Sequence, residues 1–172
     1  MRRTSFEGQQ CPIARSLERV GEWWSILILR DAFQGSTRFE QFQKNLDIAP
    51  NILTRRLTSL VEAGMMERLQ YQHRPPRYEY VLTEQGRDFR QVTWALLAWG
   101  NRHLAPEGPS IVLVDKTTGA TVDPMMVDRN TGREMTPATI RSVAGPAADA
   151  RTRARHGTLT RDGVVSSEAH YV

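Results

Sequence analysis

The sequence predicts a mainly α-helical protein with little β-structure: a winged helix-turn-helix domain followed by a short C-terminal β-hairpin extension. Three observations predict this class: two short helical patterns around a three-residue turn at 47–49, two aromatic strands behind them, and a later repeat of turn residues. We expect the winged domain, with the dimerisation surface, over 1–106. A small two-hairpin extension over 107–144 and a weakly ordered tail over 145–172 should follow.

Composition and charge limit the functional classes. The 172 residues are 40% hydrophobic and 24% charged, as in an ordinary globular domain. No run approaches the roughly 18 apolar residues of a membrane span, and the opening MRRTSFEGQQ does not resemble a signal peptide, so we expect a cytoplasmic protein without membrane contact. Up to Ala105 there are 15 Lys and Arg against 11 Asp and Glu, and after it 8 of each. This mild basic excess is compatible with a polyanionic partner.

The first three helices follow from apolar spacing and from residues that begin or end helices. A proline, favoured as a first helical residue, opens a helix over 11–20. The segment 21–33 is apolar nearly all round, as expected for a short central helix that ends before Gly35. Thr37 and Glu40 then predict a capping box for a helix of about two and a half turns.

A fourth helix follows the tight turn, opened by Pro50 and ended by a glycine. Four apolar side chains share its inner face: Leu53, Leu57, Leu60 and Val61. On a helical wheel at about 100° per residue, Asn51, Arg55 and Thr58 point away from that face. Arg56 lies at the flank, where its stem covers apolar surface and its guanidinium should reach outward.

Two strands and a long helix complete the predicted winged domain. Residues 65–71 and 77–82 read as strands, and the connection at 72–76 contains prolines that suit a hairpin tip. Thr83 caps a last helix over 83–105. Six apolar side chains form its broad stripe: Phe89, Val92, Trp94, Leu96, Leu97 and Trp99. This stripe is too wide for one small core, so we expect a second copy of the chain to cover part of it.

An internal repeat of 13 residues lies in the C-terminal part, where IVLVDKTTGATVDP aligns with MMVDRNTGREMTP. In each copy an aspartate, Asp115 or Asp128, precedes a glycine by four residues. An aspartate that bonds turn amides and a glycine at positive φ are typical of hairpin turns, so we expect two consecutive hairpins at about 111–136. The aspartates lack calcium-loop spacing and the four histidines form no zinc set, so we expect no metal.

The outward side of 50–63 and the hairpin tip are the candidate functional surfaces. A helix that presents arginine, asparagine and threonine behind a helix and a tight turn has the form that enters a DNA major groove. The tip suits phosphate or minor-groove contact. A solvated helix face and a solubilising loop are the alternatives. Ten residues are the DNA-binding candidates: Arg38, Pro50, Asn51, Thr54, Arg55, Arg56, Thr58, His73, Arg74 and Arg77.

Five segments together resemble the HxlR family of bacterial winged-helix transcription regulators, in the same order over about 11–105: CPIARSLERVGEWWSILILRDAF, RFEQF, LTRRLTSLVEAGMMER, PPRYEYVLTEQGRDF and WALLAWGNRHL. The resemblance implies a recognition helix at 50–63, a wing at 71–78, and homodimers formed by the first helix and the 83–105 helix. We therefore expect a regulator that binds double-stranded DNA sequence-specifically, as a homodimer at a pseudo-palindromic operator. The alternative is a winged-helix module that binds proteins and not DNA.

Two kinds of regulation are open. The single cysteine, Cys11, cannot form an internal disulfide, and it precedes a helix start whose positive end favours the thiolate. Some HxlR relatives sense oxidants or electrophiles through a cysteine at this position, so the resemblance makes Cys11 a candidate redox sensor. A small, packed and inert residue is the alternative. Four tryptophans either line a cavity for a small-molecule effector or build the core and dimer interface: Trp23, Trp24, Trp94 and Trp99.

An enzyme is not expected. The sequence contains no phosphate-binding glycine loop, no HExxH motif, no paired carboxylates on a common face and no recognisable nucleophile set. No cofactor is expected either.

Overall fold

A computed structural model describes Phe6 and residues 9–157. These residues form two compact units: Phe6 with 12–124 in the first, and 9–11 with 125–157 in the second. The part of the predicted tail over 158–172 lies outside the described residues.

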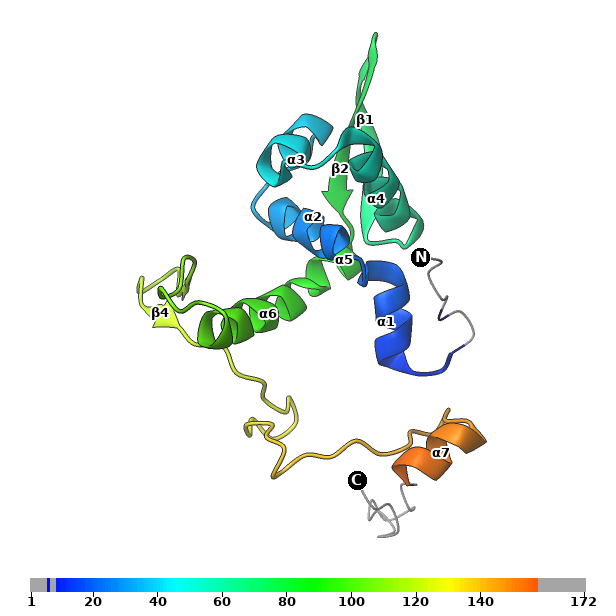
Figure 1. The fold of residues 1–172 in the computed structure, drawn as a ribbon, viewed down its shortest axis with the longest axis vertical. Helices are drawn as coiled ribbons and strands as arrows, with labels where there is room; N and C mark the ends of the chain where they lie inside the picture. The colour runs from blue at the N-terminus through cyan, green and yellow to red at the C-terminus, as the bar shows by residue number, and fades with distance from the viewer. Residues whose placement is uncertain (1–5, 7–8, 158–172) are drawn as a thin grey trace. The chain divides into compact units, whose positions relative to one another are not determined.

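The first unit contains most of the secondary structure (Figure 1). Its elements in chain order are α1 (Pro12–Val20), α2 (Trp23–Phe33), α3 (Phe39–Leu46), α4 (Pro50–Glu62), β1 (Met66–His73), β2 (Pro76–Leu82), α5 (Glu84–Asp88), α6 (Arg90–His103), β3 (Leu113–Val114) and β4 (Thr121–Val122). The predicted class, mainly helical with a small hairpin sheet, is confirmed.

The core lies where α2, α3 and α4 meet the start of β1. Its fully buried side chains come from all four elements: Ile28, Leu29, Phe42, Leu53, Leu57, Leu60 and Met66. The central position of α2 agrees with its nearly uniform apolar sequence. The core therefore fixes the helix-turn-helix and the base of the hairpin together.

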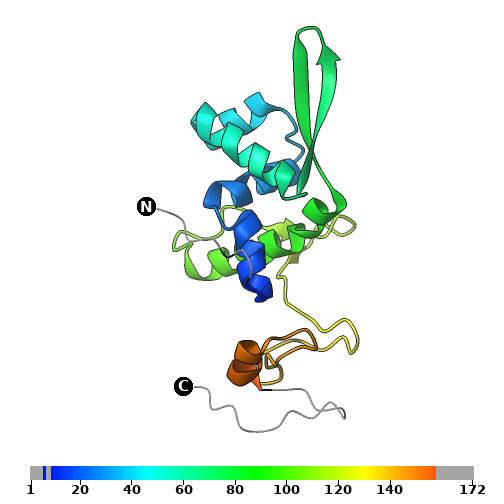
Figure 2. The same ribbon diagram turned by 90° about the vertical axis from the view of Figure 1, so that its right-hand side faces the viewer.

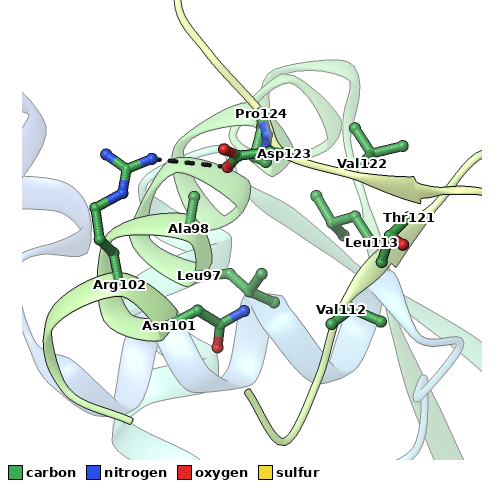
Figure 3. Close-up of a pocket in the computed structure, with 10 residues that line it drawn as sticks. All are labelled: Leu97, Ala98, Asn101, Arg102, Val112, Leu113, Thr121, Val122, Asp123 and Pro124. Carbon is green, nitrogen blue, oxygen red and sulfur yellow. Dashed lines mark ion pairs between the residues drawn. The ribbon is translucent and has the colours of Figure 1, made fainter. Parts of the chain in front are cut away.

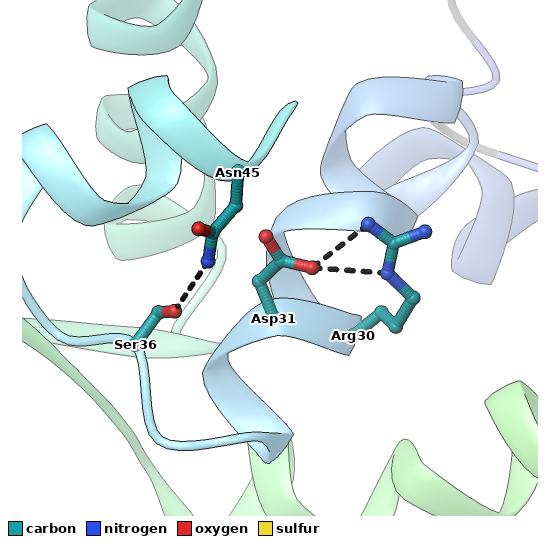
Figure 4. Close-up of polar contacts among 4 residues, drawn as sticks. All are labelled: Arg30, Asp31, Ser36 and Asn45. Atoms are coloured by element: carbon teal, nitrogen blue, oxygen red, sulfur yellow. Dashed lines mark hydrogen bonds and ion pairs between the residues drawn. The ribbon is translucent and has the colours of Figure 1, made fainter. Parts of the chain in front are cut away.

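Polar groups close the connection from α2 to α3 (Figure 4). The Asp31 side chain is buried, and its Oδ1 accepts hydrogen bonds from Nε and Nη2 of Arg30 at 2.9 and 2.8 Å. The backbone carbonyl of Asp31 accepts from the Ser36 N–H at 3.1 Å, and Asn45 Nδ2 donates to Ser36 Oγ at 3.2 Å. The Ser36 bond occupies one of the carbonyl groups that the end of α2 leaves unpaired, and the side-chain bonds pair the polar groups around it.

The start of α3 differs from the predicted capping box. Gln41, not Glu40, provides the side-chain cap: its Oε1 accepts from the backbone N–H groups of Thr37 and Arg38, each at 2.9 Å. The helix therefore begins at Phe39. The turn to α4 is as short as predicted, and Asp47 bends the chain in the left-handed region at φ 48° and ψ 41°.

The β1–β2 hairpin is longer than predicted. The strands pair antiparallel from Met66 opposite Leu82 to His73 opposite Pro76, so only two residues form the tip of the predicted 72–76 connection. The hairpin projects beyond the helices in both views (Figures 1 and 2). The segment before α3 joins its base, because the Tyr80 N–H donates to the Thr37 carbonyl at 2.7 Å.

The predicted single helix over 83–105 is wrong: two helices, α5 and α6, meet at Phe89. Thr83 caps α5 as predicted, accepting from the Gly86 N–H at 3.0 Å. A Cβ atom at Gly86 would collide with the Met65 carbonyl oxygen, so this glycine lets α5 lie close against the start of β1. Phe89 then packs against the core, whereas α6 buries no residue within this unit.

The two repeats form turns of the same kind. Gly119 and Gly132 have φ angles of 72° and 69°, and their N–H groups donate to the carbonyls of Asp115 and Asp128 at 2.8 and 2.7 Å. The first turn joins β3 and β4. The second turn lies between Val127 and Glu134, which form an isolated antiparallel β-bridge in the second unit.

The second unit also contains a helix that the sequence analysis does not predict. This helix, α7 (Ala150–His156), begins after Asp149, whose carboxylate accepts from the Thr152 N–H at 2.7 Å. This helix is therefore an element that the sequence pattern did not indicate, and the weakly ordered tail stays a prediction. The domain limits given above stay predictions.

Candidate nucleic-acid interface

The outward side of α4 carries five of the predicted site residues: Pro50, Asn51, Thr54, Arg55 and Thr58. All of them are exposed, on the opposite side of the helix from the buried leucines. Their orientation matches the helical wheel, because the leucines fix the rotation of α4 against the core. This face is therefore free to meet a partner.

Two polar side chains on this face are partly used within the helix. Thr54 Oγ1 donates to the Pro50 carbonyl at 2.8 Å, so the hydroxyl oxygen keeps its lone pairs for an incoming donor. Asn51 Oδ1 accepts from the Ile52 N–H at 3.0 Å, which leaves the two donors of its amide nitrogen.

Arg56 differs from the expectation. Its Nη2 lies 3.0 Å from Oε2 of Glu22, and the side chain is only 11% exposed. Its Nε is buried and has no hydrogen-bond partner among the described residues. Glu22 is the residue that precedes α2, so Arg56 ties α4 to α2 and does not reach outward. The predicted outward reach of its guanidinium is therefore wrong, whereas its place among the DNA-binding candidates stays untested.

Arg38 links the start of α3 to the hairpin. It is exposed, forms a backbone bridge with Glu79, and holds its guanidinium carbon 4.8 Å from the centre of the Tyr71 ring. This distance is that of a cation–π contact. Tyr71 was not predicted as part of the site, since its place at the strand irregularity beside Arg38 depends on the tertiary fold.

The hairpin tip presents His73, Arg74 and Arg77, all exposed. Sequence reasoning missed the residue that organises it. Gln72 Nε2 donates to the carbonyls of Arg74 and Pro75, at 3.1 Å each, and so crosses the tip. Both carbonyl groups are thereby held toward the strands.

Arg68 is a third residue of this surface that the sequence pattern did not indicate. It lies on β1, and its guanidinium carbon is 3.5 Å from the centre of the Tyr78 ring on β2. Arg68 is exposed, so the hairpin carries a further cation away from its tip. The strand pattern alone gives no sign that this side chain stacks across the hairpin.

The residues predicted to take part in regulation are Cys11 and the four tryptophans. Cys11 is exposed and directly precedes α1. A pocket of about 330 Å³ lies between α6 and the β3–β4 hairpin (Figure 3). Its lining contains none of the four tryptophans, so it is not the aromatic cavity that they suggested. At its rim, Arg102 Nη2 lies 3.7 Å from Asp123 Oδ1, with both side chains largely exposed.

The described residues contain no group of three or more potential metal ligands. Nor does any described helix have the length and apolarity that a membrane crossing requires.

Comparisons with known proteins relate the chain to transcriptional regulators. A family model described as HxlR-like helix-turn-helix matches residues 19–108. Rv3095 of Mycobacterium tuberculosis, named as an uncharacterised HTH-type transcriptional regulator, is 42% identical over 147 residues, which cover 85% of this chain and 92% of that protein.

Solved structures agree with this relation. PA1374 of Pseudomonas aeruginosa, described as a candidate transcription factor, is 56% identical with a TM-score of 0.62, over 84% of this chain and 99% of its own. PA1607, described in the same way, is 36% identical with a TM-score of 0.74, over 83% and 100%. In both, the similarity extends beyond the winged part into the C-terminal extension.

Proposed function

Because this chain belongs to the HxlR-like helix-turn-helix family of transcriptional regulators, we propose that it binds double-stranded DNA sequence-specifically as a homodimer. Its relatives are named as regulators, so the proposed role is binding and not catalysis. The observation that carries the proposal is the exposed polar face of α4 opposite its buried leucines.

In this proposal α4 lies in the major groove. Arg55 has the paired donors that suit the O6 and N7 acceptors of guanine, and Asn51 suits adenine. Thr54 and Thr58 lie beside them on the same face of α4. Pro50 begins the helix, and in this proposal it lies near the sugar-phosphate backbone of the DNA. The exposure of all five side chains supports a major-groove position for α4.

The wing and Arg38 supply contacts to phosphates or to the minor groove. His73, Arg74 and Arg77 gather at the tip, and such contacts position a protein without reading sequence. Most of the affinity should come from these charges, so binding should weaken steeply with salt.

The homodimer would form through α1 and α6. Ile13 of α1 is 72% exposed, and α6 has exposed apolar side chains along its length. Two copies related by a two-fold axis would place two α4 helices on a pseudo-palindromic operator.

Regulation by an oxidant, an electrophile or another small effector is also proposed, with Cys11 as the responsive residue. Cys11 is exposed and is the only cysteine in the sequence, so a disulfide would join two chains or a small thiol. An oxidant should then change the operator affinity of the parent protein but not that of Cys11→Ser.

The test is binding of purified protein to genomic DNA fragments at several salt concentrations. We expect a subset of fragments to bind tightly and to share a pseudo-palindrome. Arg55→Lys keeps the charge but loses the planar pair of donors, so it should lose discrimination among sites while the salt slope is retained. Arg74→Ala should weaken all sites about equally.

A protein-binding module without DNA affinity is the second candidate. It would be favoured if the purified protein bound none of the duplex fragments and instead retained a protein partner in a pull-down, whereas DNA binding without sequence preference would count against the sequence-specific reading of α4. An Arg55→Lys variant that discriminated sites like the parent would refute the assignment of α4.

A further inference from the structure

The second unit carries a basic helix that the proposed contacts of α4 and the wing do not use. The helix α7, orange in Figure 1, has three arginines among its seven residues and no acidic side chain. The carboxylate of Asp149, just before it, is occupied by the Thr152 N–H. Hydrogen bonds from Thr152, followed by the charges of Arg151 and Arg153, lower the pKa of Asp149.

Two of the three arginines share one face. At about 100° per residue, Arg151 and Arg155 lie about 40° apart, whereas Arg153 lies on the other side. Nη2 of Arg153 donates to the Pro146 carbonyl at 3.4 Å and so ties α7 to the preceding segment. Arg151 and Arg155 are both exposed, and within the described part of the chain neither forms an ion pair.

The two arginines repel each other on the helix surface, because like charges four residues apart oppose helix formation. Arg151 lies in the first turn, near the positive end of the helix dipole, whereas Arg155 lies in the last turn, where a cation is favourable. An anionic partner that contacts both guanidinium groups would reverse the balance, because arginine forms paired, charge-assisted hydrogen bonds with phosphate.

We propose that Arg151 and Arg155 contact phosphates of the DNA duplex to which the protein binds. The inference rests on the proposed DNA-binding function. Duplex DNA is the favoured partner because a bound duplex offers a continuous row of phosphates to a pair of guanidinium groups. The α7 helix would then extend the contact without adding sequence preference.

The test uses the full chain with Arg151→Ala and Arg155→Ala together, on an operator fragment selected by the parent protein. Each lost phosphate contact should make the slope of log K against log salt shallower by about 0.9. The two substitutions remove four such contacts from a bound homodimer, so the slope should change by about 3.6. Discrimination between the operator and a mutated operator should be unchanged. A hydroxyl-radical footprint should lose protection at the backbone positions that these two residues contact.

The matched control is Arg129→Ala with Arg133→Ala, which removes the same charge from the second hairpin of the same unit. Alanine favours helix, so α7 should persist in the test variant. An unchanged slope and footprint, or an equal loss in the control, would overturn the α7 contact alone. A parent protein that bound no duplex would overturn this inference and the proposed function together.

Discussion

Arg55 and Arg56 are adjacent in the chain, yet they face different surroundings. Arg55 is exposed on the outer face of α4, whereas Arg56 turns to Glu22 at the start of α2. The rotation of about 100° between neighbouring helical residues separates the two roles. One guanidinium is free for DNA, and the other holds the helix that would carry it.

The first prediction separates these roles by stability. Arg56→Ala removes a charge-assisted contact and the packing of a long stem, so the free energy of unfolding should fall by about 1–3 kcal/mol. Arg55→Ala, at an exposed position, should change it by about 0.5 kcal/mol or less. Urea titration followed by circular dichroism measures both. Equal stabilities of the two variants would show that the Glu22 contact contributes little.

At the scale of elements, the shape of the wing tip depends on Gln72. Its amide crosses from β1 to two carbonyls at the tip and leaves the cationic side chains on the outside. Since a flexible tip must be ordered when it meets DNA, pre-ordering should favour binding.

The second prediction is that Gln72→Met weakens DNA binding several-fold with little loss of global stability. Methionine keeps the length of the side chain but cannot donate to the two carbonyls. Hydrogen exchange at the tip should become faster, and all sites should lose affinity alike. Gln85→Met, at an exposed position of α5, is the matched control. Parent-like affinity and exchange in Gln72→Met would contradict the role of Gln72.

The third prediction concerns the first repeat turn. Backbone and side-chain hydrogen bonds from Thr118, and a further backbone bond from Thr117, hold the pKa of Asp115 below its ordinary value of 3.8. A carboxyl whose pKa is lower in the folded state stabilises the fold above its unfolded pKa, and the contribution is lost as the pH falls through the folded pKa. The turn should therefore stay intact at pH 5 and loosen below about pH 4.

The amide resonance of Thr118 in an NMR titration gives the measurement. Its shift should follow a transition with a midpoint below 3.8. Asp115→Asn keeps an acceptor but does not titrate, so it should abolish the transition. A midpoint at or above the ordinary aspartate value would be inconsistent with these bonds.

The helices up to Glu62 and the two wing strands could be predicted because each has local signals: apolar spacing and residues that begin or end it. The break at Phe89 could not, since 83–105 keeps helical spacing on both sides and the close approach of α5 to Met65 depends on the tertiary fold. The α7 helix lacks an apolar stripe, so its sequence resembles a loop.

The candidate site was predictable where the position of a residue on one helix face determines whether its side chain is exposed. Asn51, Arg55 and Thr58 depend only on the rotation of α4 against its leucines. Arg56 and Gln72 depend on partners that the pattern does not indicate: a glutamate on another helix and carbonyls across a tip. Contacts between residues that lie far apart in the sequence are therefore the part of the site that the sequence pattern does not predict.

At the scale of the whole molecule, α6 is a helix with one side covered. The β3–β4 hairpin faces Leu97 and Ala98 across the pocket, whereas Leu96 and Trp99 are 47% and 54% exposed on the other side. A large exposed apolar stripe is uncommon in a monomer and typical of an interface. The proposed homodimer would cover it.

The last prediction tests that interface through Leu96→Glu. A carboxylate at the centre of a dimer contact would lose its hydration without gaining a partner, so the dimer dissociation constant should rise by about 100-fold or more. Sedimentation analysis at micromolar concentration should find dimers of the parent chain and monomers of the variant. Because the proposed operator binding needs two α4 helices at a fixed spacing, the variant should also lose the gain in affinity of a full pseudo-palindrome over a half-site. Gln91→Glu adds the same charge at an exposed position of α6 that lies about 140° around the helix from Leu96. This control variant should remain dimeric. If Leu96→Glu stayed dimeric and kept that gain, the two-fold contact would have to lie elsewhere on the molecule.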